Sequence, residues 1–198
     1  MTDKDTFLQL ISKITREGFK KEELINSLSN SDFFSAPAST KYHNSFEGGL
    51  VDHSLNVYYN MMSLNERKHL GIPEESIIIV SLFHDLYKRN FYKKSVQNKK
   101  VYSESGSKHD ELGRYDWVST PIYAVSEDRF LFGPNGSTSE FMISKFINLT
   151  LDESIAIVNM NLKDDMLDMA LLNKCPLLTI AKCADILSCY IDEKIVDE

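Results

Sequence analysis

The sequence has few cysteines and no long apolar run. It contains three cysteines in 198 residues, none of them in a Cys-x-x-Cys pair. All lie between 175 and 189, in an apolar stretch, so we expect reduced core residues rather than a disulfide framework. This favours a cytoplasmic location. No apolar run approaches the roughly 20 residues that cross a bilayer, and the first residues do not resemble a signal peptide, so no membrane partner is expected.

The 22 lysines and arginines are fewer than the 29 acidic residues, so the formal net charge is −7. This balance argues against an extended grip on duplex DNA or RNA. The segment 86–101 is an exception, because it has no acidic residue and carries Lys88, Arg89, Lys93, Lys94, Lys99 and Lys100. It is either a solvated loop or a rim that attracts phosphate, and its position after the strongest motif of the chain favours the rim.

Apolar periodicity predicts a largely helical chain. We expect helices at about 5–17, 20–28, 50–70, 73–90, 137–146, 151–161, 164–172 and 176–194. The segments 122–125 and 130–132 flank Ser126-Glu127-Asp128 and predict a β-hairpin. The expectation is a single domain over 1–198, with a loop and β-hairpin insertion at about 91–135.

Polar residues interrupt two of the most apolar predicted helices. His84 and Asp85 follow Ile77–Phe83, and Asp185 lies inside the apolar stretch 177–187. A buried carboxylate without a partner costs several kcal/mol, so such groups are normally paired or bound to metal. Lys182 is a poor partner for Asp185, because a lysine side chain tends to extend towards solvent. The two acids therefore indicate a shared cation.

A further histidine follows a pair of glycines at a predicted helix start. The pattern is Gly48-Gly49-Leu-x-x-His53, then an apolar helix that ends in His84-Asp85-Leu-x-Lys88, then Ala-Asp185 in a late apolar helix. Each element alone is weak, since a lone histidine in an apolar helix is more often a hydrogen-bonded core residue. Together, imidazole and carboxylate ligands suit a divalent ion such as Mn²⁺, Fe²⁺, Co²⁺, Ni²⁺ or Mg²⁺.

This combination resembles the HD-domain superfamily of metal-dependent phosphohydrolases, from about Tyr42 to Ile191. Its first two blocks are also similar to the HD part of bacterial 3′→5′ exoribonucleases, and its middle stretch is similar to small phage and prophage HD proteins. The resemblance implies a mainly α fold, an HD-domain helical bundle with a small β-hairpin insertion. It implies that His53, His84, Asp85 and Asp185 bind the metal and that Lys88 and His43 face the substrate phosphate.

The sequence also departs from that family's pattern. Tyr87 stands where the family usually has glycine, and the two additional histidines of its two-metal members are missing. The resemblance therefore implies one divalent ion, or a second weak site at which Asn135 or Asn159 provides an oxygen.

The expected function is hydrolysis of a nucleotide or a related phosphate ester. Asp85 would hold the ion and orient a water, and Lys88 and His43 would stabilise charge on the phosphoryl oxygens. Asn135 is expected near the substrate, and Arg114 and Trp117 could clamp a base by stacking. Trp117 could equally anchor the insertion to the core. Two further hypotheses are a module that binds or senses a nucleotide without turnover, and a structural hydrogen-bond network of the buried polar residues.

Overall fold

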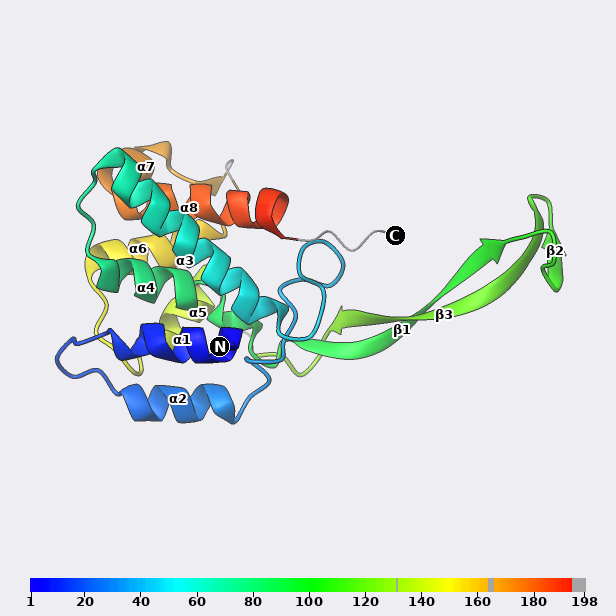
Figure 1. Ribbon diagram of the computed structural model, residues 1–198, viewed down its shortest axis with the longest axis horizontal. Helices are drawn as coiled ribbons and strands as arrows, with labels where there is room; N and C mark the ends of the chain where they lie inside the picture. The colour runs from blue at the N-terminus through cyan, green and yellow to red at the C-terminus, as the bar shows by residue number, and fades with distance from the viewer. Residues whose placement is uncertain (131, 164–165, 194–198) are drawn as a thin grey trace.

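The computed structural model describes residues 1–130, 132–163 and 166–193. Its helices and strands follow one another along the chain as α1 Asp3–Ser12, α2 Lys21–Ser29, α3 Gly49–Lys68, α4 Glu74–Phe83, the 3₁₀ turn η1 Leu86–Lys88, β1 Tyr92–Tyr102, β2 Lys108–Asp110, β3 Gly113–Val125, α5 Asn135–Ile143, α6 Leu151–Met160, α7 Met169–Lys174, α8 Pro176–Leu187 and the π-helical turn η3 Ser188–Asp192. The helices gather into one body, from which the strands project as a long arm (Figure 1).

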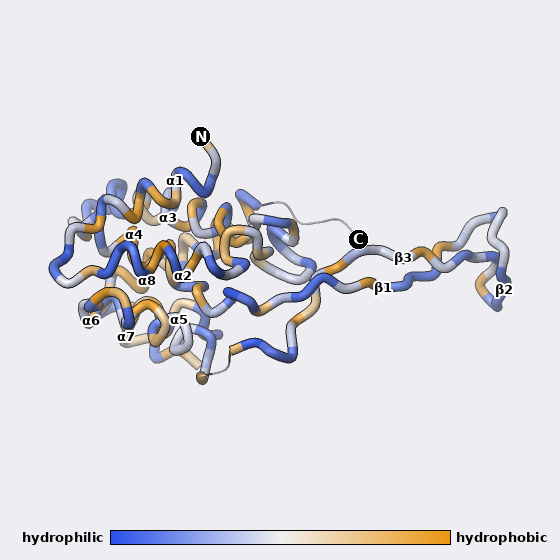
Figure 2. The backbone as a smooth tube through the Cα atoms, turned by 90° about the horizontal axis from the view of Figure 1, so that it is seen from below, coloured by the Kyte–Doolittle hydropathy of each residue, from blue (hydrophilic) through white to orange (hydrophobic). Residues whose placement is uncertain are grey.

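The helical body is organised around α3, which packs against α4 and α8. Helix α6 packs against α5, α4 and α8 on the other side of α4. The core is formed by buried side chains from all these elements, and its largest fully buried members include Phe7, Phe33, Phe83, Leu50, Met61 and Ile77. Hydrophobic and hydrophilic stretches alternate along the helices of the body (Figure 2). The body therefore supplies a rigid frame for polar residues placed within it.

The break between α4 and η1 positions the His-Asp pair. Every residue of α4 from Ser76 to Phe83 is buried, so this helix crosses the centre of the body. The helix ends with His84 as its C-cap, and Asp85 leaves the helical conformation at φ −105°. The prediction of one helix running to residue 90 is therefore wrong. Adjacent polar side chains at such an end can converge on one point, which a continuous helix would not favour.

The arm is a three-stranded antiparallel sheet in the order β1-β3-β2. Strand β1 pairs with β3 from Tyr92 opposite Val125 to Tyr102 opposite Tyr115. The short β2 pairs with the outer end of β3, with Lys108 opposite Tyr115. Most residues of both long strands are exposed or only half-buried, so the arm has little core of its own.

The predicted fold class was a mainly α HD-domain helical bundle with a small β-hairpin insertion. This prediction is wrong, because the inserted element is a long three-stranded sheet and not a small hairpin. Helices account for 50% of the chain, and the three-stranded sheet accounts for another 15%. The strands pair over 92–125, whereas the expected hairpin paired 122–125 with 130–132. A ribbon exposed on both faces has no alternation of apolar and polar residues, so β1 gave no strand signal.

Several predicted elements extend into residues outside the described ranges. These are the second half of the expected hairpin at Leu131, the start of the expected helix at Asp164 and the end of the last helix at Lys194. The last helix itself changes to a π-helical turn after Leu187. Among the described residues, no helix combines the length and the apolar character that crossing a membrane would require.

Gly49 illustrates how tightly the start of α3 is packed against the preceding loop. A Cβ atom at this position would lie 2.1 Å from the carbonyl oxygen of Asn44. We expect Gly49→Ala to destabilise the protein by about 1–3 kcal/mol, because backbone atoms must shift to relieve the overlap. Gly133→Ala is the matched control, since its Cβ would meet nothing closer than 4.0 Å. Urea unfolding of both variants measures the difference, and equal midpoints would contradict this packing argument.

Candidate metal centre

Two histidine rings meet inside the helical body. His53 of α3 is 1% exposed and His84 at the end of α4 is 0% exposed, and their Nε2 atoms lie 3.2 Å apart. His84 Nδ1 lies 2.8 Å from the carbonyl oxygen of Ser81, which can only accept, so this nitrogen carries a proton. His53 Nδ1 lies 2.7 Å from Glu193 Oε1. Both Nδ1 atoms are thus engaged by protein oxygens, and both Nε2 atoms face a common point, as in histidines that bind metal.

Two aspartates border the same point. Asp85 Oδ2 lies 3.5 Å from His84 Nε2 and 3.7 Å from His53 Nε2. Asp185 Oδ1, from α8, lies 3.3 Å from His53 Nε2. Asp85 Oδ1 accepts a hydrogen bond of 3.0 Å from Asn161 Nδ2, which holds the carboxylate in place. The ligand atoms of His53, His84 and Asp85 all lie within 4.8 Å of one another and could hold a metal ion.

The charges of this cluster are balanced by protons and by one lysine. Burial alone would lower the pKa of His53, but its hydrogen bonds to Asp185 and Glu193 outweigh burial and raise the pKa to about 9. Burial favours protonation of Asp85, yet the Lys88 ammonium holds its pKa well below the usual range. A proton on His53 therefore neutralises the converging acceptors, and a divalent cation could displace it.

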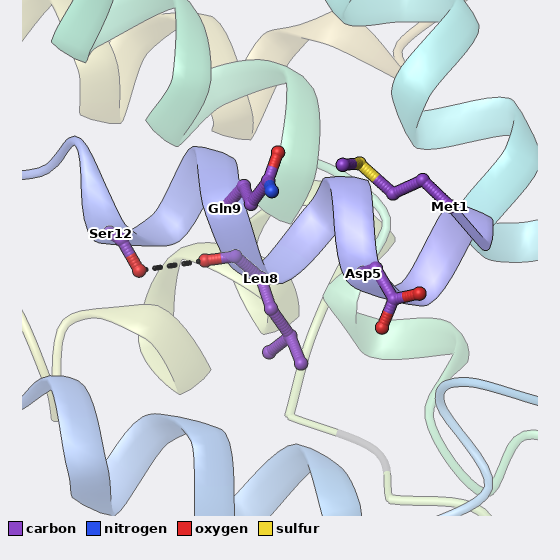
Figure 3. Close-up of a pocket in the computed structure, with 5 residues that line it drawn as sticks. All are labelled: Met1, Asp5, Leu8, Gln9 and Ser12. Carbon is purple, nitrogen blue, oxygen red and sulfur yellow. Dashed lines mark hydrogen bonds between the residues drawn. The ribbon is translucent and has the colours of Figure 1, made fainter.

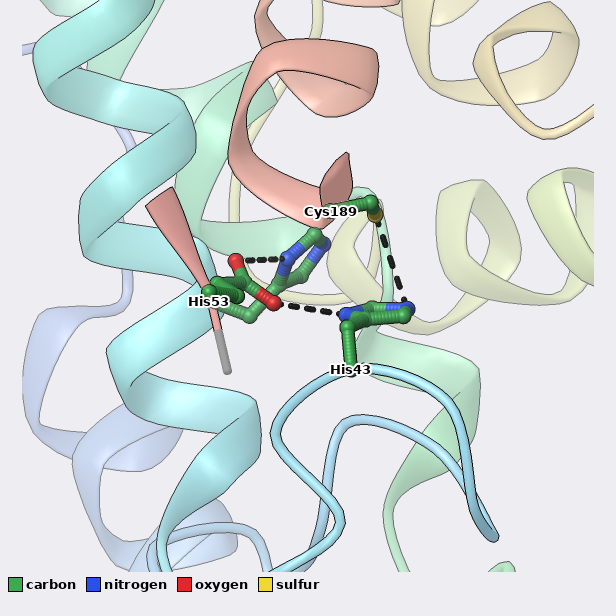
Figure 4. Close-up of side chains that lie close together, drawn as sticks. His43, His53 and Cys189 are labelled. Carbon is green, nitrogen blue, oxygen red and sulfur yellow. Dashed lines mark hydrogen bonds and ion pairs between the residues drawn. The ribbon is translucent and has the colours of Figure 1, made fainter. Parts of the chain in front are cut away.

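A second group of polar side chains lies on the outer side of His53. Glu193 bridges two rings, since its Oε2 lies 2.6 Å from His43 Nδ1 and its Oε1 contacts His53 Nδ1 (Figure 4). Cys189 Sγ lies 3.5 Å from His43 Nε2. Burial raises the pKa of Glu193, but hydrogen bonds from His43 and His53 outweigh it and lower the pKa to about 2. This ionised carboxylate fixes the orientation of His53 and connects it to the loop that carries His43.

Lys88 is buried beside the cluster. Its Nζ lies 2.6 Å from Asp85 Oδ2 and 2.6 Å from the carbonyl oxygen of Ala38. The burial of Lys88 separates it from the lysines of the adjoining strand, which are exposed. Of the two readings of the basic segment, a solvated loop does not describe Lys88, whose charge is directed at Asp85.

The other candidate residues are Asn135, Arg114 and Trp117 for the substrate, and Asn135 or Asn159 for a second metal site. Asn135 is exposed in the first turn of α5, and Asn159 donates to the Ile155 carbonyl of its own helix at 2.7 Å. Arg114 and Trp117 lie on the outer part of β3, at the end of the arm that is distant from the helices (Figure 1). The structure thus connects His43, His53, His84, Asp85, Lys88 and Asp185. Among the described residues, no hydrogen bond or ion pair joins these six to the four other candidates.

Sequence reasoning did not identify Glu193, Asn161 or Cys189 as parts of this network. Glu193 follows the last helix in a polar stretch, where an acidic residue carries no signal of burial. The π-helical turn after α8, which precedes Glu193, has no sequence signature of this kind. Asn161 ends α6, and its contact with Asp85 depends on how α6 packs, which periodicity does not specify.

A hollow of about 570 Å³ on the outer side of α1 lies apart from this network (Figure 3). Met1, Asp5, Leu8, Gln9 and Ser12 line it. The Asp5 carboxylate is already engaged by Thr2 in a helix-capping box, and Ser12 bonds the Leu8 carbonyl. The hollow therefore offers no group for chemistry.

Comparison with models of protein families, with curated proteins and with solved structures found no match to this chain. Nothing therefore identifies the helical body as an HD domain.

Proposed function

We propose that the chain is a metal-dependent phosphohydrolase that acts on a nucleotide or a related phosphate ester. One observation supports this most: His53 Nε2 and His84 Nε2 face each other beside Asp85 Oδ2, while both Nδ1 atoms are engaged by protein oxygens. Two imidazole nitrogens with carboxylates suit one divalent ion such as Mn²⁺, Fe²⁺, Co²⁺, Ni²⁺ or Mg²⁺. His53, His84, Asp85 and Asp185 would hold that ion, and the similarity of their motifs to those of HD-type phosphohydrolases supports the same chemistry.

The bound cation would supply Lewis acidity and lower the pKa of a water molecule. The residues of the chain would provide the rest. Asp85, held by Asn161 and Lys88, keeps one carboxylate oxygen directed at the two histidines. Lys88 maintains a positive charge there, which would stabilise charge on the phosphoryl oxygens. His43, oriented by Glu193, would face the same phosphate.

Metal analysis of protein purified without chelator, followed by a screen of nucleotides for phosphate release with Mn²⁺, Co²⁺ and Mg²⁺, tests the proposal. We expect one tightly bound ion per chain and metal-dependent release. Two ions at similar occupancy would contradict the single site. Bound metal without release from any nucleotide would favour a module that binds or senses its ligand, and a protein that binds no metal would favour a structural network.

Lys88→Ala tests the lysine separately from the metal. We expect unchanged metal content and a loss of turnover of about 100-fold, because one stabilising positive charge near the phosphate disappears. Lys93→Ala, in the same basic segment but exposed and paired with Glu127 at 3.8 Å, is the control. Normal kinetics in Lys88→Ala would exclude a contact of Lys88 with the substrate and would leave it a structural role, through its bonds to Asp85 and the Ala38 carbonyl.

The location proposed with this function is the cytoplasm. Cys175 is buried, Cys183 is exposed and Cys189 is partly buried, and all are free thiols in the structure. Free thiols are maintained in reducing compartments.

A further inference from the structure

A second polar cavity lies between the loop that carries His43 and the base of the arm. Its volume is about 550 Å³, which is in the range of small-molecule sites. Three lysines line it, Lys41 from the loop and Lys94 and Lys99 from β1, together with Gln97, Thr120 and Tyr123. Among the described residues, none that lines this cavity is acidic.

The positive charge of this cavity is largely uncompensated. Lys94 Nζ lies 3.3 Å from Glu47 Oε2, in an exposed pair that contributes little. In the described part of the chain, no ion pair joins Lys41 or Lys99 to a carboxylate. Among the neighbouring lysines of β1, Lys93 pairs with Glu127 and Lys100 pairs with Asp110. The cavity thus collects two ammonium groups without an ion pair, those of Lys41 and Lys99, and one in an exposed pair, that of Lys94, in a protein whose net charge is −7.

One closed loop connects this cavity to the metal centre. The backbone N–H of Ala38 donates to the Asn44 carbonyl at 3.1 Å, and Ser39 Oγ donates to the His43 carbonyl at 2.7 Å. The loop presents His43 to Glu193 and presents Lys41 to the cavity. Lys88 also donates to this loop, at the Ala38 carbonyl. An anion in the cavity would therefore contact the loop that forms one wall of the centre.

We propose that this cavity binds a linear phosphate chain, such as a diphosphate or triphosphate group. Three ammonium groups offset the charge of such a chain, and the Gln97 amide and Thr120 hydroxyl can donate hydrogen bonds to its oxygens. The ring of Tyr123 provides an apolar surface for a group attached to the chain. The inference adds a ligand site to the proposed function and does not depend on the metal.

Calorimetric titration of the full chain in the presence of a chelator tests this site alone, because the metal centre is then inactive. The probes are orthophosphate, inorganic triphosphate and adenosine triphosphate. We expect triphosphate to bind at least tenfold more tightly than orthophosphate. Lys94→Ala and Lys99→Ala should each weaken triphosphate binding by about tenfold, as expected for the loss of one charge-assisted contact. Tighter binding of adenosine triphosphate would assign the attached base to Tyr123, and equal binding would assign recognition to the phosphate chain alone.

Lys93→Ala and Lys100→Ala are the matched controls, because each removes the same charge from a neighbouring position outside the cavity. Both should bind triphosphate like the unmodified chain. An equal loss of triphosphate affinity in all four variants would indicate nonspecific attraction and would contradict the proposed site. Equal affinity for orthophosphate and triphosphate would contradict it as well. The chelator removes any role for a metal, so the two proposals are tested independently. A lack of triphosphate binding would not contradict the proposed phosphohydrolase, and a lack of phosphate release would not contradict the triphosphate site.

Discussion

Asp185→Ala is expected to abolish both bound metal and phosphate release while the helical content stays the same. Asp185 contributes a carboxylate from α8, with Oδ1 at 3.3 Å from His53 Nε2. Its side chain is 25% exposed, so its removal leaves no large cavity in the core. A divalent ion that loses one of its anionic ligands should bind at least 10- to 100-fold more weakly, which is the range seen even for outer-shell changes.

Asp192→Ala is the control for this substitution. Asp192 lies at the end of the turn that follows α8, where its carboxylate accepts a 2.7 Å hydrogen bond from Asn60 rather than from a histidine. Metal content measured by elemental analysis, with circular dichroism for helical content, separates the two variants. Full metal occupancy in Asp185→Ala would remove Asp185 from the ligand set, and loss of metal in both variants would indicate a general disturbance of this segment.

The helices could largely be placed from the sequence because their apolar residues recur with helical period. The starts of α3, α6 and α8 are within a residue of the predicted ones. The strands of the arm and their pairing could not be predicted, because long strands exposed on both faces show no apolar alternation. The end of α4 at Phe83 was not predicted for another reason. It depends on contacts of His84 and Asp85 with other elements, and a local sequence pattern carries no information about such contacts.

The centre could be predicted only in part, for a similar reason. His84 and Asp185 stood out because polar groups inside apolar helices need partners. The hydrogen bonds that orient His53 and Asp85 could not be predicted, since Glu193 and Asn161 come from segments that are polar in any case. Trp117 was predicted either to clamp a base or to anchor the insertion to the core. The structure instead places it on the outer part of β3, where its side chain is 49% exposed.

Arg16→Ala is expected to lower the free energy of unfolding by about 3–5 kcal/mol, the cost of leaving a buried charge without its partner. Arg16 holds Glu153 with two hydrogen bonds, of 2.6 and 2.8 Å, and the Glu153 side chain is 0% exposed. Its guanidinium also bonds Glu75 of α4 at 3.0 Å, so one side chain joins the end of α1 to the starts of α4 and α6. Lys13→Ala is the control, because its pair with Glu74 is exposed and should contribute less than about 1 kcal/mol.

The pH dependence of this loss follows from Glu153. Burial would raise its pKa, but the hydrogen bonds from Arg16 and the Thr150 backbone outweigh burial and hold the pKa below the ordinary 4.5. The stability that Glu153 contributes is thus fully present above pH 4.5 and is lost as the pH falls through the lowered value. In Arg16→Ala, burial without the cation raises the pKa instead, so acid protonates Glu153 and relieves the penalty. Urea unfolding at pH 7 and pH 4 should therefore show the difference between variant and unmodified chain narrowing in acid, and a difference that widened in acid would contradict the buried pair.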